Sequence, residues 1–179
     1  MAGRKSDKIK IQDGYGAINL EHPEEYKPWL HTRDVRSGSG KRHIIPDLVY
    51  PNRMIYLMSN LERDTYYYLR LNEKVQELFE QVPLELKETL SICEELGIAH
   101  PRIPSTGEWS VMTTDFLVYF RKENSFEFQA FAVKPEKELD DQRVLEKLRV
   151  EQIYWTRKKI PWSIITEAVF DSTRSNGYE

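Results

Sequence analysis

Apolar residues recur along most of the chain with two spacings, and these spacings predict its strands and helices. Residues 114–121 and 126–134 are rich in aromatic and β-branched side chains and flank a charged turn, which is typical of a β-hairpin. Residues 139–158 instead place apolar side chains three and four positions apart, which is typical of an amphipathic helix. By the same criteria we expect a hairpin over 48–57, helices over 60–71 and 84–96, and strands over 75–82 and 162–165. This order predicts an α/β fold in which helices flank a mixed sheet.

Residues 1–45 differ from the rest of the chain because they are mostly polar and contain two basic clusters. Such a segment predicts a flexible basic N-terminal arm, which is either a solvated tail or an arm that orders on phosphate groups. The rest of the chain is expected to form one folded domain over 46–168 and a C-terminal tail over 169–179.

Composition narrows the class of protein. Apolar residues make up 40% of the 179 residues and charged residues 31%, as in soluble globular proteins. No apolar run approaches the roughly 18 residues that a membrane span needs, so we expect a cytoplasmic protein with no membrane partner. The formal net charge of −3 gives no overall signal for nucleic acid, and any DNA-binding surface must therefore be local. The lone Cys93 is expected to pack in the core, because no second cysteine is present for a disulfide or a cysteine-based zinc site.

Asp115 and Lys134 form the first candidate for chemistry. Asp115 opens one strand of the second predicted hairpin and Lys134 ends the other, so both should lie at one edge of the sheet. A carboxylate there can hold a divalent cation, and a lysine ammonium can offset the negative charge that develops on a phosphate. Aspartate and lysine at strand ends are also common surface residues, so this pair alone does not define a site.

Two further carboxylates lie on helices that can reach the same edge. Glu62 stands three residues after Ser59, which is also the spacing of a helix-capping box, so capping is its alternative role. Glu151 lies on the apolar stripe of the long helix, where a carboxylate costs free energy unless it is paired or bound to a metal. Its alternative role is a salt bridge to Lys147, one turn earlier.

The segments around these four residues resemble the TnsA family, which comprises endonuclease subunits of heteromeric cut-and-paste transposases. The matching blocks are residues 57–62, 111–118, 131–135 and 144–155, in the family's order and spacing. The resemblance extends from about residue 28 to about residue 168. It implies a restriction-endonuclease-like core, with a mixed sheet between helices.

The resemblance also implies roles for individual residues. Glu62, Asp115, Lys134 and Glu151 would form the catalytic set, in which Lys134 activates or positions the attacking water and Glu151 is a supporting acidic residue. Glu62, Asp115 and the Val133 carbonyl would bind Mg²⁺, or Mn²⁺ in its place.

The reaction and the partners follow from the same resemblance. The family hydrolyses double-stranded DNA at transposon ends, on the strand that its partner, a TnsB-like DDE integrase, leaves intact. A TnsC-like ATPase regulates the pair, but longer family members contact it through a second domain beyond the matched region, so that contact stays open.

Ala132 departs from the family, which commonly has glutamine at this position. The alternatives are therefore a stand-alone phage or defence endonuclease, or a non-catalytic module with a decayed nuclease site that binds DNA or the transposase.

Basic side chains are the candidates for contacts with DNA phosphates. Four belong to the N-terminal arm, and three lie at the end of the long helix, where their alternative role is to favour the helix dipole. These residues are Arg33, Arg36, Lys41, Arg42, Arg157, Lys158 and Lys159.

Overall fold

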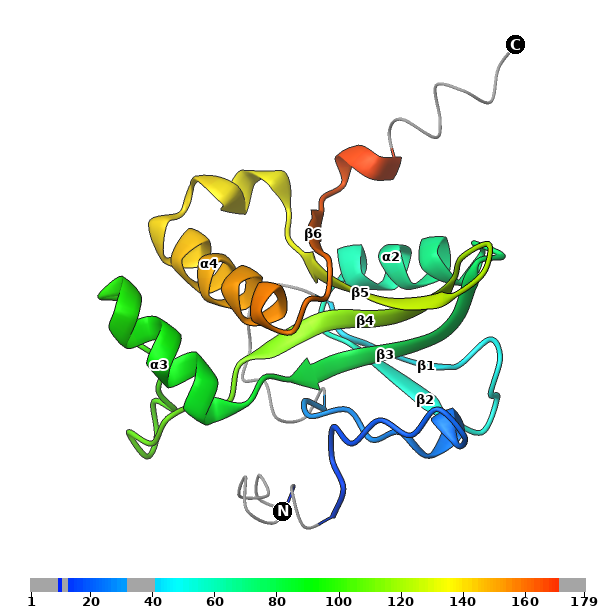
Figure 1. Ribbon diagram of the computed structural model, residues 1–179, viewed down its shortest axis with the longest axis horizontal. Coiled ribbons are helices and arrows are strands. Elements are labelled where there is room, and N and C mark those ends of the chain that lie inside the picture. The colour runs from blue at the N-terminus through cyan, green and yellow to red at the C-terminus, as the bar shows by residue number, and fades with distance from the viewer. Residues whose placement is uncertain (1–9, 11–12, 32–40, 171–179) are drawn as a thin grey trace.

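A four-stranded mixed sheet forms the centre of the molecule (Figure 1). The computed structural model describes residue 10, residues 13–31 and residues 41–170. Strands β3 (Val75–Pro83), β4 (Thr113–Arg121) and β5 (Phe126–Val133) are antiparallel neighbours, and β6 (Trp162–Ile165) pairs parallel with β5. The predicted mixed sheet is confirmed.

Helices cover both faces of this sheet (Figure 1). Helix α2 (Asn60–Arg70) lies on one face, and α3 (Leu86–Leu96) and α4 (Gln142–Arg157) lie on the other. Successive side chains of a strand point to opposite faces, so Phe116 joins the core under α2 and Leu117 joins the core under α3 and α4. The sheet is thus buried on both sides around the positions where the candidate residues lie.

Two helices begin later than their sequence pattern predicts. Helix α3 starts at Leu86 because the Leu84 N–H still donates to the Met112 carbonyl at 2.8 Å and continues the sheet contacts. Helix α4 starts at Gln142 because a 3-10 turn, Glu136–Asp140, precedes it and Asp141 then caps it. Both departures have local causes and leave the predicted helices otherwise intact.

The first hairpin lies earlier in the sequence than predicted. Strand β1 (His43–Pro46) pairs antiparallel with β2 (Met54–Leu57), and the residues predicted as the first strand, 48–50, lie in the connection. The predicted position of that strand is therefore wrong. Leu48 and Val49 are more than half exposed, whereas Asp47 is buried, the reverse of what the apolar pattern suggests.

Buried charges attach this hairpin to the rest of the fold. Arg53 contacts both Asp47 and Glu80, and Arg70 contacts Asp47 at 2.9 Å. We call these four residues the hairpin ion cluster. Their side chains are at most 2% exposed, and they join the β1–β2 connection to β3 and α2. Breaking the cluster should therefore loosen the hairpin from the sheet.

The described part of the predicted N-terminal arm packs against the sheet. Tyr26 and Trp29 are buried, and the Trp29 N–H donates to the Gln81 carbonyl at 3.1 Å. Gly16 has a φ of +77°, and a Cβ at this position would lie 2.3 Å from Cγ of Pro83, so glycine is needed there. Residues 13–31 of the predicted arm are thus packed against the sheet, and the flexibility of the arm stays a prediction. Residues 1–9, 11–12 and 32–40 lie outside the described part.

The start of the predicted C-terminal tail is also in contact with the body. The Phe170 ring packs edge-on against Tyr68 with centroids 5.7 Å apart, and residues 171–179 lie outside the described part. Within the described ranges, no helix combines the length and the apolarity that crossing a membrane requires.

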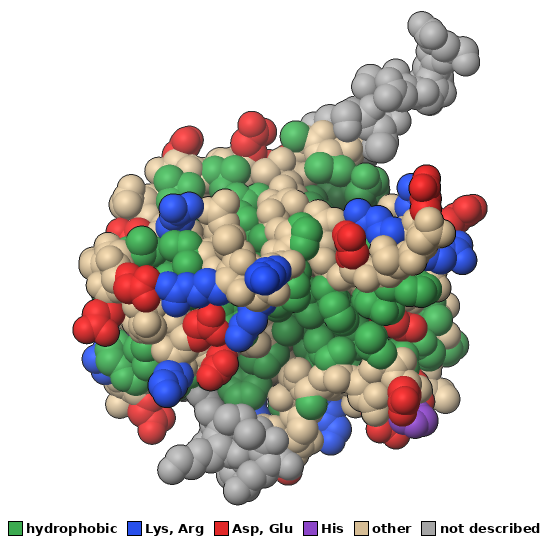
Figure 2. Space-filling view, in the orientation of Figure 1, with side chains coloured by type: hydrophobic (Ala, Val, Ile, Leu, Met, Phe, Trp, Pro, Cys, Tyr) green, Lys and Arg blue, Asp and Glu red, His purple; other side chains and the backbone are tan. Residues whose placement is uncertain are grey.

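Apolar side chains also gather on the outer surface, beside α4 on the viewed face (Figure 2). Tyr119 stacks on Phe126 with ring centroids 5.2 Å apart and contacts Phe128 at 4.8 Å. Phe128 in turn packs against the core under α4. These rings cover the end of the sheet that the helices leave open.

Candidate active site

Glu62 enters the site from the first turn of α2. Its backbone N–H donates to Ser59 Oγ at 3.0 Å, and its carboxylate accepts from the Met58 N–H at 2.8 Å and from Ser59 Oγ at 3.3 Å. The capping role is therefore present. Glu62 is only 5% exposed, and burial, followed by the negative charge of Asp115, raises the pKa of Glu62 to about 8. The residue thus caps the helix and also places a buried carboxylate near Asp115.

Asp115 and Lys134 are in direct contact at the edge of the sheet. Asp115 Oδ2 accepts from the Val133 N–H at 2.7 Å and from Lys134 Nζ at 3.2 Å. Lys134 Nζ also donates to the Val133 carbonyl at 2.9 Å. The Lys134 N–H donates to the Ile165 carbonyl at 3.0 Å, so β6 fixes the backbone of this lysine. The antiparallel pairing of β4 and β5 brings the two residues together, as the sequence predicts.

The charge of Lys134 is set by its neighbours. Burial by itself would lower the pKa of Lys134, but the negative charges of Asp115, Glu151 and Glu62 outweigh burial and raise that pKa above its ordinary value. The side chain is therefore a protonated ammonium. In this state it can donate hydrogen bonds and offset negative charge, but it cannot accept a proton.

Glu151 projects from α4 into the same region and is held by neutral donors. Its Oε1 accepts from Thr114 Oγ1 at 2.8 Å and from Trp162 Nε1 at 3.0 Å, and Trp155 Nε1 donates to the same Thr114 oxygen at 2.6 Å. Burial, followed by the charge of Asp115, raises the pKa of Glu151 to about 7. Among the described contacts of Glu151 there is no salt bridge to Lys147, so the alternative role predicted for Glu151 is wrong.

Sequence reasoning missed several residues of the site. Thr114, Trp155 and Trp162 hold Glu151, and Gln81 donates to Glu62 Oε2 at 3.0 Å. The position of Thr114 next to Asp115 is a weak signal that was available. Nothing in the sequence marks Gln81, because its contact depends on how α2 packs on the sheet.

The donor set fits a hard divalent cation. The described residues contain no group of three or more His, Cys, Asp or Glu side chains arranged to hold a metal ion. Glu62 and Asp115 nonetheless form a pair of carboxylates whose mutual repulsion contributes to the raised pKa of Glu62, and a cation would relieve that repulsion. One or two carboxylates, completed by waters and substrate phosphates, are typical of Mg²⁺ sites in proteins.

The seven basic residues predicted to contact DNA differ in exposure and in their ion pairs. Arg33 and Arg36 lie outside the described residues, Lys41 is exposed and Arg42 is half-buried. Arg157 lies 2.6 Å from Glu95, and Lys158 lies 2.8 Å from Glu88, so both connect α4 to α3. Lys159 is exposed after the end of α4. The DNA contacts of all seven stay predictions, and two of these residues have a second role in helix packing.

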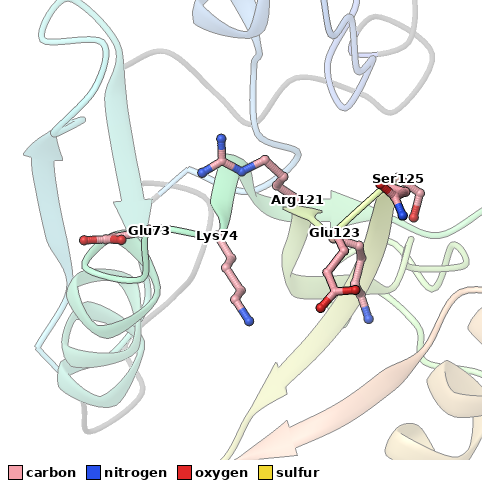
Figure 3. A pocket seen from close by; sticks show the side chains of 7 residues that line it. Glu73, Lys74, Arg121, Glu123 and Ser125 are labelled. Atoms are coloured by element: carbon pink, nitrogen blue, oxygen red, sulfur yellow. The ribbon is translucent and has the colours of Figure 1, made fainter.

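A surface hollow lies at the opposite end of β4 from Asp115. Residues of the β4–β5 turn and of the start of β3 line it, among them Lys74, Arg121 and Glu123 (Figure 3). Asp115 and Arg121 are six residues apart on one strand, a separation of roughly 20 Å. The hollow contains none of the predicted site residues and is separate from the carboxylates.

Comparison with known proteins shows the family to which this fold and site belong. Residues 72–167 match the family described as "TnsA-like endonuclease N terminal", and the chain belongs to this family. It is 39% identical over 158 residues to the protein named "Transposon Tn7 transposition protein TnsA" of Escherichia coli. The alignment covers 88% of this chain and 55% of that protein, so the chain spans about half the length of this relative. The resemblance predicted from the four sequence blocks is confirmed.

Proposed function

We propose that this chain is the metal-dependent DNA endonuclease subunit of a heteromeric transposase. It would hydrolyse a phosphodiester at the transposon ends, on the strand that the partner integrase leaves intact. The observation that carries this proposal is the cluster at the sheet edge, where Asp115 contacts Lys134 and both lie within electrostatic range of Glu62 and Glu151. Family membership supports the reaction class, and the name of the E. coli relative supports the context of transposition.

The residues of the site suggest a division of labour. Glu62, Asp115 and the Val133 carbonyl would hold Mg²⁺ or Mn²⁺, which when bound polarises the scissile phosphate as a Lewis acid. Lys134 is protonated and partly exposed, so it can donate to a phosphate oxygen or orient the attacking water. Because Glu151 is held by Thr114 and Trp162, it would act through its charge and by fixing Thr114 beside Asp115.

Cations beside the site offer a place for the DNA backbone. Lys147 is exposed on α4, one turn before Glu151. Burial of part of its side chain lowers the pKa of Lys147, and the nearby positive charges of Arg143 and Lys134 lower it further. A phosphate bound between these cations would relieve their repulsion. Double-stranded DNA therefore fits this side of the site, and the TnsB-like integrase and TnsC-like ATPase are its proposed protein partners.

Nicking of labelled transposon-end DNA tests the proposal. The chain would be mixed with a TnsB-like integrase and assayed in Mg²⁺, in Mn²⁺ and in EDTA. Lys134→Ala removes the ammonium from the site, and Lys122→Ala, on the exposed β4–β5 turn, is the matched control. We expect metal-dependent nicks on the strand that the integrase leaves intact, a loss of about 100-fold or more in Lys134→Ala, and wild-type nicking in Lys122→Ala.

Four outcomes would contradict the proposal. Nicking that persists in EDTA would exclude metal dependence, and unchanged nicking by Lys134→Ala would place the active site elsewhere. Metal-dependent nicking without the integrase would favour a stand-alone endonuclease. Binding to transposon-end DNA without any nicking in either metal would favour the non-catalytic module, consistent with an alanine at position 132.

A further inference from the structure

Gln81 has a backbone conformation that is unusual for a residue within a strand. Its φ is +49°, and among the described residues only Lys159 shares a positive φ without being glycine. This region is disfavoured for a residue with a side chain, and such strained residues cluster at functional sites. Gln81 is also 2% exposed, so its amide is buried and needs partners.

The side chain of Gln81 spans the distance between α2 and the sheet. Its amide nitrogen donates to Glu62 Oε2 at 3.0 Å, and its amide oxygen accepts from Thr113 Oγ1 at 3.3 Å. With a cation bound, Glu62 is ionised and only accepts hydrogen bonds, so the amide nitrogen of Gln81 is the group that suits it. The Trp29 N–H bonds to the Gln81 carbonyl and holds the backbone in this orientation.

The register of the sheet places Gln81 next to Asp115. Strand β3 pairs Glu80 with Phe116 and Val82 with Thr114, so Gln81 lies between these pairs, opposite Asp115. The other described hydrogen bonds to the Glu62 carboxylate come from Met58 and Ser59, which immediately precede α2. Among the described residues, Gln81 is therefore the sheet residue that ties this carboxylate to the strand beside Asp115.

We propose that Gln81 is a positioning residue that fixes the Glu62 carboxylate against Asp115, so that the two can bind one divalent cation together. This inference rests on the proposed function, because it concerns the affinity of the same metal site. Groups that orient metal ligands commonly contribute 10–100-fold to metal affinity. Without Gln81, Glu62 would keep its bonds to Met58 and Ser59 but lose its attachment to the sheet.

Two variants of Gln81 separate positioning from folding. Gln81→Met keeps the approximate length of the side chain and removes the donor. Gln81→Asn keeps an amide and tolerates a positive φ well, but is one methylene too short to reach Glu62. The matched control is Gln129→Met, which removes a 3.2 Å amide bond to Ser163 elsewhere in the same sheet.

The measurement is Mn²⁺ binding to the purified full chain, followed by electron paramagnetic resonance, with thermal melting of each variant in EDTA. We expect the Mn²⁺ dissociation constant to rise about 10–100-fold in Gln81→Met and Gln81→Asn, and to change less than about twofold in Gln129→Met. In the nicking assay, the Mg²⁺ concentration for half-maximal rate should rise by the same factor. The rate at saturating Mg²⁺ should return close to the wild-type rate.

Wild-type Mn²⁺ affinity in either folded Gln81 variant would overturn the positioning role and leave the metal site itself standing. If Gln81→Met does not fold, Gln81→Asn decides the question by the same criterion. A wild-type chain that binds no Mn²⁺, or a Glu62→Gln variant that binds it as tightly as wild type, would instead overturn the proposed metal site, and the role of Gln81 with it.

Discussion

Two groups of charged side chains meet at neighbouring residues of β3, Glu80 and Gln81, and serve different ends. The hairpin ion cluster contains two carboxylates, Asp47 and Glu80, and two guanidinium groups, Arg53 and Arg70. Its charges balance, and every member contacts an opposite charge. Such a group holds elements together, here the first hairpin against β3 and α2, and has no charge left for a ligand.

The group at the sheet edge also consists of acidic and basic side chains, but its negative and positive charges do not balance. Three carboxylates, Glu62, Asp115 and Glu151, lie within electrostatic range of one ammonium, Lys134. When all are ionised, the group has a formal excess of two negative charges. Burial and mutual repulsion raise the pKa of Glu62 to about 8 and that of Glu151 to about 7. Charge that is buried without compensation, rather than buried charge as such, therefore distinguishes the proposed metal site from the hairpin ion cluster.

The sharpest test of this contrast is Asp115→Asn. Asparagine can still accept from the Val133 N–H, but the substitution removes a negative charge and the proposed metal ligand. We expect nicking to fall about 1,000-fold or more, since several kcal/mol of metal stabilisation are lost and each 1.36 kcal/mol corresponds to tenfold in rate. The free energy of unfolding should change little, because relief of the repulsion with Glu62 offsets loss of the ion pair with Lys134. Single-turnover nicking and urea unfolding measure the two quantities.

The control for this variant is Asp64→Asn, an exposed carboxylate on α2 whose partner among the described residues is Arg63. It should nick DNA as the wild type does. A folded Asp115→Asn protein that nicks within tenfold of wild type would contradict the assignment of Asp115 as a metal ligand.

Arg53→Met should lower the free energy of unfolding, which Asp115→Asn is expected to leave nearly unchanged, because it breaks the hairpin ion cluster. Glu80 would lose its cation and keep the backbone N–H of Tyr56, leaving a buried charge without compensation. We expect the free energy of unfolding to fall by about 3–5 kcal/mol, measured by urea unfolding. Arg63→Met, which removes an exposed ion pair, should change it by less than about 1 kcal/mol. If Arg53→Met also lowered the free energy of unfolding by less than about 1 kcal/mol, apolar contacts would be what holds the hairpin.

Glu151→Gln should have the smallest effect, and its sign depends on pH. The folded-state pKa of Glu151, about 7, is above the ordinary value of 4.5. Below pH 4.5 the residue is protonated in both states. As pH rises toward 7 the unfolded chain loses this proton first, so the metal-free protein loses stability until the folded-state pKa is passed. Glutamine does not titrate, and its oxygen can still accept from Thr114 and Trp162.

Urea unfolding in EDTA at pH 5 and pH 8 measures this effect. The wild type should lose about 2–3 kcal/mol more than Glu151→Gln between the two values. Equal losses in both proteins would mean that Glu151 is not held in a buried, charge-repelling position.

The parts of the site that could be predicted from sequence are those fixed by local pattern. Alternation along β4 and β5 predicts an antiparallel hairpin, and this hairpin is sufficient to bring Asp115 to Lys134. The Ser59 to Glu62 spacing predicts a cap, and the cap sets where the Glu62 side chain starts. The apolar stripe of α4, with residues three and four positions apart, predicts a buried Glu151, and Glu151 is buried. Each of these depends on residues close in sequence or on adjacent strands.

The parts that could not be predicted depend on contacts between distant segments. Gln81 adopts a positive φ in a structure that brings Trp29 to its carbonyl and Glu62 to its amide. The first hairpin was misplaced because Leu48 and Val49 look like core residues, yet the ion cluster draws Asp47 inward and leaves them in solvent. Where buried charges decide the packing, the apolar pattern alone gives the wrong answer.

The parallel pairing of β6 with β5 has a consequence for when the site exists during synthesis. The Ile165 carbonyl holds the backbone of Lys134, and Trp162 holds Glu151, although both partners are made well after the residues they support. Domains fold as units while the chain leaves the ribosome. A nascent chain that has exposed β3, β4 and β5 but not yet β6 therefore lacks the supports of its lysine and of one carboxylate, so the proposed nuclease site is complete only once β6 has been made.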